Sequence, residues 1–195
     1  MTTISQDGSF KSARPSKPNL WHVFQPDKLK SIRSGLWFSR LDLFGDKLEN
    51  TLPMPNKCII AKMPDGAKKF INKTVERSVY QNYALCFHHS DKAPSRHIWS
   101  TFGQRQGIAF LTNYDRLKDA TKQFWGENGP LYLHDVMYID HATDSVDMYN
   151  VINIAFAIRK GFQKEEETRF LIHTAGSDAK SKLAGIVESQ SLLVL

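Results

Sequence analysis

The sequence has 195 residues, a formal net charge of +6 and an isoelectric point near 9.3. Hydrophobic residues make up 41% of it and charged residues 24%, a composition that excludes disordered and fibrous proteins. No apolar stretch approaches the roughly 20 residues of a membrane-spanning helix, and the N-terminus lacks the apolar core of a secretory signal. We therefore expect a cytoplasmic protein with a flexible N-terminal arm over 1–18 and a single globular domain over 19–195.

The hydrophobic pattern predicts a mixture of strands and helices. The expected strands cover 19–24, 36–44, 83–89, 107–114, 131–140 and 165–173. The expected helices run from Pro26 to Gly35 and over 70–83, 116–125 and 148–162, with a short helical turn around Ile98 and Trp99. The last five residues, 191–195, are a strand or a short helix. Strands and helices do not alternate regularly and no phosphate-binding glycine motif occurs, so we predict an α+β fold.

Cysteine chemistry is not prominent in this chain. Cys58 and Cys86 are far apart and no CxxC motif occurs, so neither a disulfide framework nor a cysteine-rich zinc site is indicated. The segment CFHH at 86–89 places neighbouring side chains on opposite faces of a strand, and no second pair has suitable spacing. We therefore expect no metal site in that segment.

Three consecutive glutamates at 165–167 precede an apolar run in an otherwise basic chain. If this segment is extended, Glu165, Glu167 and Arg169 share one face, and Glu166 lies on the other. The pattern fits a salt-linked solvent face on an edge strand. It also fits a site in which paired carboxylates raise each other's pKa and stabilise a developing cation, with Arg169 keeping at least one of them ionised.

An ordered series of motifs resembles a bacterial and phage family of unknown function that is associated with defence and toxin loci. The resemblance covers about residues 20–172. Its motifs are F-x-D-x-x-E, C-aromatic, W-x-x-aromatic-G and F-x-x-E-x-E-x-R, here Phe44, Asp46, Glu49, Cys86, Phe87, Trp99, Phe102, Gly103, Phe162, Glu165, Glu167 and Arg169.

Two segments are more remotely similar to ADP-ribosyltransferases: the His-bearing strand, helix and glycine turn of 20–36, and the E-x-E of 165–167. That resemblance implies NAD as co-substrate. It gives His22 a role in holding NAD, Glu167 the role of catalytic glutamate and Glu165 a role in activating the acceptor. A fixed carboxylate would stabilise the oxocarbenium-like sugar left when the nicotinamide bond breaks. The fold is then an ADP-ribosyltransferase-like α+β domain.

Other residues complete the predicted cofactor site. Arg40 is a candidate for binding a pyrophosphate, with ion pairing to Asp42 or Asp46 as the alternative. Tyr83 is a candidate for contacting the cofactor from the strand over 83–89, and Arg169 from the closing strand.

Three functional classes are compatible with these patterns. The first is an NAD-dependent ADP-ribosyltransferase, a toxin or phage-defence effector whose basic surface suits RNA or DNA as acceptor. The second is a non-catalytic module that binds nucleic acid, an antitoxin or another defence-system protein. The third is a metal-dependent nuclease whose carboxylates hold Mg²⁺. Its candidate ligands are Asp46, Glu49, Glu165 and Glu167.

Overall fold

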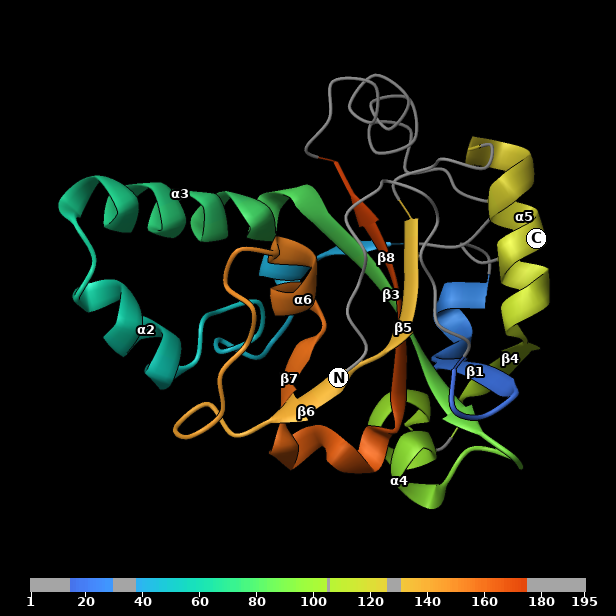
Figure 1. Ribbon diagram of the computed structural model, residues 1–195. Coiled ribbons are helices and arrows are strands. Elements are labelled where there is room, and N and C mark those ends of the chain that lie inside the picture. The colour runs from blue at the N-terminus through green and yellow to red at the C-terminus, as the bar shows by residue number, and fades with distance from the viewer. Residues whose placement is uncertain (1–14, 30–37, 105, 126–130, 175–195) are drawn as a thin grey trace.

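An antiparallel sheet forms the centre of the fold (Figure 1). The computed structural model describes residues 15–29, 38–104, 106–125 and 131–174. The strands of the sheet lie in the order β4-β1-β3-β8-β5, and β2 also pairs with β3. These strands are β1 (Asn19–Phe24), β2 (Ser39–Arg40), β3 (Asn82–Ser90), β4 (Ile108–Thr112), β5 (Leu131–Asp135) and β8 (Glu167–His173). A separate parallel pair consists of β6 (Met137–Ile139) and β7 (Ala157–Arg159).

The helices connect and cover these strands. They are α2 (Met54–Ala61), α3 (Asp65–Gln81), α4 (Arg96–Ile98), α5 (Tyr114–Trp125) and α6 (Val151–Ala155). Short 3₁₀ turns occupy Pro26–Lys28, Leu41–Leu43 and Lys160–Glu165, and a π-helical turn occupies Trp99–Gly103. Among the described residues, no helix combines the length and apolar character needed to cross a membrane.

Each face of the sheet packs against a different helix. On one face, Leu85 and Phe170 pack with Leu117 of α5. On the other face, Ala84 and Leu171 contribute to a cluster that also contains buried α6 residues. This arrangement follows from the strict alternation of side chains along a strand, because a strand covered on both sides must be apolar at nearly every position. Figure 1 shows α5 on the right of the sheet and α6 with the α2–α3 hairpin on the left.

The two central strands, β3 and β8, pair in one continuous antiparallel register from Asn82↔His173 to His88↔Glu167. Strand β1 pairs with β3 only as far as Trp21↔His88, whereas its pairing with β4 continues to Phe24. The sheet is therefore forked, because β1 remains paired with β4 after it has separated from β3.

Most of the predicted elements are confirmed in kind. The α+β class is correct, and strands occur in the predicted regions of β1, β3, β4, β5 and β8. The predicted helices at 70–83 and 116–125 correspond to α3 and α5, and the turn around Ile98 is α4 followed by the π-helical turn. The expected stretch 191–195, most of the 26–35 helix and most of the N-terminal arm lie outside the described residues.

Three predictions of secondary structure are wrong in part. In the described part of the strand expected over 36–44, residues 38–44, only Ser39–Arg40 forms a strand, and a 3₁₀ turn follows it. The helix α2 was not predicted. The strand expected over 131–140 is divided at Val136 into β5 and β6. The helix expected over 148–162 ends at Ala155 and continues as β7, whose Ala157 and Ile158 are fully buried. A short, continuous apolar run fits a buried strand and a buried helix equally well.

Candidate functional site

A pocket of about 90 Å³ lies at the fork between β1 and β3. Aromatic and apolar groups make up most of its wall, with two carboxylates and two imidazoles among them. The residues that line it are Trp21, His22, Val23, Cys86, Phe87, His88, Ile98, Phe102, Glu165 and Glu167. His22, Glu165 and Glu167, which the sequence analysis proposed as site residues from two distant segments, therefore lie around one cavity.

His22 occupies the place where the β1–β3 ladder ends. Its Nδ1 donates a hydrogen bond of 2.8 Å to the carbonyl oxygen of Cys86, so the ring replaces a strand-to-strand bond. The ring also contacts Phe24 and Phe87 at centroid distances of 5.7 and 5.9 Å. Burial lowers the pKa of His22, which the Cys86 contact only partly offsets. The imidazole is therefore neutral at pH 7, with Nε2 as its unprotonated nitrogen.

Trp21, the residue before His22, contributes an unsatisfied donor. Its indole nitrogen is buried and has no hydrogen-bond partner among the described residues. A buried donor left without a partner costs about 1–3 kcal/mol, so such groups are uncommon in folded proteins.

The π-helical turn forms another wall of the pocket. It presents Phe102, which is 42% exposed, and ends at Gly103. A Cβ at Gly103 would lie 3.0 Å from the Trp99 ring and 3.4 Å from Val23 of β1, so a larger residue would push the turn away from the strand. Single π-helical turns are rare and occur frequently at functional sites.

The three glutamates form a tight turn rather than the start of a strand. Glu165 ends a 3₁₀ turn, Glu166 has left-handed backbone angles (φ 43°, ψ 57°), and β8 begins at Glu167. The prediction that Glu165 shares a strand face with Glu167 is therefore wrong in its mechanism. The left-handed residue ends the 3₁₀ turn just before the strand begins, and the side chains of Glu165 and Glu167 both line the pocket.

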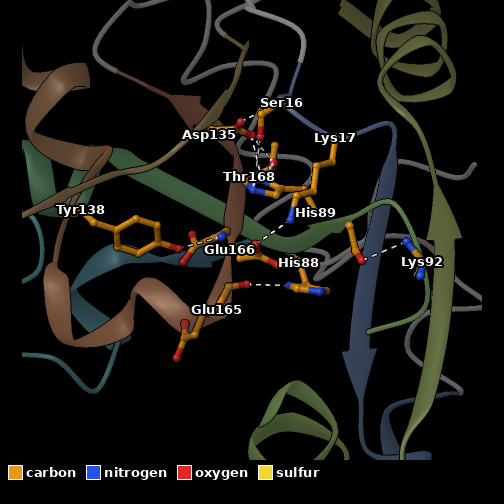
Figure 2. A network of polar contacts seen from close by, with 12 residues as sticks. Ser16, Lys17, His88, His89, Lys92, Asp135, Tyr138, Glu165, Glu166 and Thr168 are labelled. Carbon is orange, nitrogen blue, oxygen red and sulfur yellow. Dashed lines mark hydrogen bonds and ion pairs between the residues drawn. The ribbon is translucent and has the colours of Figure 1, made fainter. Parts of the chain in front are cut away.

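Neighbouring strands hold this turn through its backbone, as Figure 2 shows. His88 donates through Nδ1 to the Glu165 carbonyl at 2.8 Å, and the backbone N–H of His89 donates to the Glu166 carbonyl at 2.8 Å. The N–H of Glu167 donates to the Tyr138 hydroxyl at 2.7 Å. The backbone of each residue of the turn thus has a hydrogen-bond partner, which fixes the path of the chain there.

Glu165 has the most shifted carboxyl of the turn. Burial, followed by repulsion from Glu167 and Glu49, raises the pKa of Glu165 to about 7. At neutral pH this carboxyl is close to half protonated, so it can both accept and donate a proton. It is the group in the pocket best suited to general acid–base catalysis.

Glu167 belongs to a buried ion cluster with Arg169. The Arg169 guanidinium is 1% exposed; its Nε donates to Glu167 at 2.8 Å, and it also pairs with Glu49. It donates through Nη1 to the Ala155 carbonyl at 2.6 Å and lies 5.5 Å from the Phe44 ring centre. Burial alone would lower the pKa of Arg169, but the neighbouring acids raise it above its usual range.

The charges of this cluster do not cancel. Two carboxylates, Glu49 and Glu167, share one cation, so an excess negative charge lies beside the pocket. Burial raises the pKa of Glu49, opposed by Arg169. Burial, and after it the negative charge of Glu167, raises the pKa of the Cys86 thiol. Cys86 is therefore protonated at neutral pH and is not an activated nucleophile. The cluster can therefore supply an ion-paired carboxylate at a defined position.

Glu166 points away from this cluster. Its carboxylate pairs with Lys17 at 2.6 Å, and that contact, against a smaller effect of burial, lowers the pKa of Glu166. The same end of the sheet carries a second polar network, in which Asp135 accepts from Thr168 at 2.5 Å and from the Ser16 N–H at 2.7 Å (Figure 2). These contacts attach Ser16 to β5 and Lys17 to the turn before β8.

The remaining predicted cofactor residues do not line the pocket. Arg40 forms a bidentate pair with Asp42 at 2.5 and 2.9 Å, which was the alternative to pyrophosphate binding. Tyr83 packs against the core cluster on the opposite face of β3 from Cys86.

Arg169 is committed to Glu49, Glu167 and the Ala155 carbonyl, so it positions carboxylates and has no exposed surface for a cofactor.

Sequence reasoning missed three residues that line the cavity, Trp21, Cys86 and His88. Glu49, which it considered as a metal ligand, instead belongs to the ion cluster. The alternation in YALCFHH places Cys86 and His88 on one face, so that signal was present. The pairing of Glu49 with Arg169 joins positions 120 apart in the chain and has no local signature.

Among the described residues, no group of three or more His, Cys, Asp or Glu side chains is arranged to hold a metal ion. Of the four acids considered for a nuclease, Asp46 pairs with Arg159 at 2.7 Å, and Glu49 and Glu167 pair with Arg169.

A scan of protein-family models, a search of curated proteins and a search of solved structures each found no match.

Proposed function

We propose that the pocket at the fork of β1 and β3 is the active site of an NAD-dependent ADP-ribosyltransferase. One observation carries the proposal: Glu165, Glu167 and His22, which come from two distant segments, line the same small cavity. Their environments differ, since Glu165 has a pKa near 7 and Glu167 is paired with Arg169. Two carboxyl groups held in different environments are a recurring basis for divided catalytic roles.

The pocket size sets which part of NAD would enter it. A cavity of about 90 Å³ accommodates at most one ring-sized group, so we place the nicotinamide end there and the rest of the dinucleotide outside. Trp21 and Phe102 provide apolar walls for the ring. The neutral His22 ring supplies a polar contact.

The reaction then divides between the two glutamates. The bond between the ribose and the nicotinamide nitrogen breaks, and its electron pair leaves with the ring, which becomes neutral. Positive charge develops on the sugar beside Glu167, whose fixed position stabilises it. An acceptor hydroxyl forms the new carbon–oxygen bond, and its proton passes to Glu165.

Release of nicotinamide from NAD tests this proposal. The purified protein is incubated with NAD, with water and bulk RNA as acceptors, and nicotinamide is quantified by chromatography. We expect release by the wild type and a loss of at least about 100-fold in Glu165→Gln. Glu166→Gln is the matched control because the same substitution lies one residue away, against Lys17.

Two results would contradict a transferase. One is no nicotinamide release by the wild type, which would favour the non-catalytic binding module. The other is equal loss in Glu165→Gln and Glu166→Gln, which would mean that the pocket carboxyl has no special role.

A further inference from the structure

The positive charge of the chain is concentrated in the α2–α3 hairpin. Residues 54–81 contain six Lys or Arg against two Asp or Glu, which is four of the six net positive charges in the sequence. In Figure 1 this hairpin extends to the left of the sheet, away from α5. The rest of the chain is nearly balanced, so the hairpin is a distinct basic surface.

One side of α3 carries most of this surface. Lys69, Lys73 and Arg77 are exposed and follow one another at intervals of four residues. With 3.6 residues per turn, they lie within a roughly 100° sector of the helix, on the side opposite the buried Ile71 and Ser78. In the described part of the chain, none of these three cations has an ion-pair partner.

Two exposed aromatic rings lie in the same sector. Phe70 is 71% exposed and Tyr80 is 58% exposed. The Arg40 guanidinium lies 5.4 Å from the centre of the Tyr80 ring, so that ring already has a partner. Phe70, at the edge of this sector, is therefore the aromatic best placed to contact a ligand.

We propose that this stripe, defined by Lys69, Phe70, Lys73 and Arg77, binds single-stranded nucleic acid. The three cations contact phosphates and the Phe70 ring stacks on a base. From Lys69 to Arg77 the helix advances about 12 Å, so the three cations can contact neighbouring phosphates of one strand. A duplex keeps its bases stacked on one another, so an exposed ring beside the cations favours a single strand. The surface is separate from the pocket and does not depend on the NAD proposal.

Fluorescence anisotropy tests the proposal with a labelled single-stranded DNA of about 20 nucleotides and the same strand annealed to its complement. We expect the wild type to bind the single strand more tightly, with log K falling against log salt at a slope of about −2 for three phosphate contacts. The variant K69Q/K73Q/R77Q should weaken binding by at least about ten-fold and bring the slope towards zero.

Two variants separate the contributions of charge and stacking. Phe70→Ala should weaken single-strand binding about five-fold or more with an unchanged salt slope, since stacking does not release counterions. K47Q/K92Q/K164Q is the matched control, because it removes three other exposed lysines outside the hairpin. No binding by the wild type, an equal loss in the control, or tighter binding of the duplex would each overturn the proposal.

Discussion

At the scale of single residues, Arg169 is the side chain on which the ion cluster depends. It is fully buried between Glu49 and Glu167, so its removal leaves two carboxylates in the protein interior without a cation. We predict that Arg169→Met lowers the free energy of unfolding by about 3–5 kcal/mol in urea denaturation. Arg40→Met, which breaks the partly exposed pair with Asp42, should cost less than about 1 kcal/mol. Equal effects would contradict the role assigned to Arg169.

Glu165 should also make stability depend on pH in a characteristic way. Its pKa rises from about 4.5 in the unfolded chain to about 7 in the fold, so the folded state binds the extra proton between these values. Its stabilising contribution is complete below pH 4.5 and is lost as the pH rises to about 7. Against Glu165→Gln, the wild type should lose on the order of 1–2 kcal/mol over this range, because solvent screens a half-buried carboxyl.

Glu166 provides the control, since its shift has the opposite sign. The Lys17 pair lowers the pKa of Glu166 in the fold, so its contribution is present at neutral pH and is lost as the pH falls. Urea denaturation of wild type, Glu165→Gln and Glu166→Gln at pH 8, pH 5 and pH 3 measures both effects, because the Glu165 contribution changes between pH 8 and pH 5 and the Glu166 contribution below pH 5. Parallel pH dependence in the two variants would contradict the different environments of the two glutamates.

At the scale of elements, the turn that precedes β8 stores backbone strain at Glu166. Its left-handed φ of 43° costs an L-residue about 1–2 kcal/mol, whereas glycine adopts it readily. We predict that the free energy of unfolding of Glu166→Gly exceeds that of Glu166→Val by about 1–2 kcal/mol in urea denaturation. Both variants lose the Lys17 pair, so the comparison isolates the backbone. Equal stability would show that the turn is not strained.

The elements that the sequence predicted well are those whose local pattern agrees with their final environment. The alternation around Cys86 and the apolar run after Glu167 indicate strands, and both are central strands. The segment 148–162 has the same apolar character in its helix and in β7, so its change of structure at Ala155 depends on pairing with β6.

The residues of the candidate site were also predictable only in part, because some of their contacts depend on tertiary packing. His22, Glu165 and Glu167 stand out as polar residues beside apolar strands, and the structure brings them to one pocket. The left-handed angles of Glu166 and the contact between Glu49 and Arg169 depend on tertiary packing, which leaves no local pattern in the sequence.

At the scale of the whole molecule, two apolar clusters on opposite faces share the strands of one sheet. Cores joined in this way should unfold together. Leu117→Ala, on the α5 side, and Ile152→Ala, on the α6 side, should each cost about 2–5 kcal/mol, because both side chains are buried in these clusters. Circular dichroism and tryptophan fluorescence should follow one coincident transition in each variant. Two separate transitions would mean that the faces fold independently.

The chemistry of the pocket depends most directly on the ionisation of Glu165, which carbon-13 NMR titration of the glutamate carboxyl groups measures. The resonance lost in Glu165→Gln should titrate near pH 7, and the one lost in Glu166→Gln should titrate below 4.5. That result would establish a proton-exchanging carboxyl in the pocket beside the ion-paired Glu167. Titration of both glutamates near 4.5 would contradict it and leave the pocket without its acid–base group.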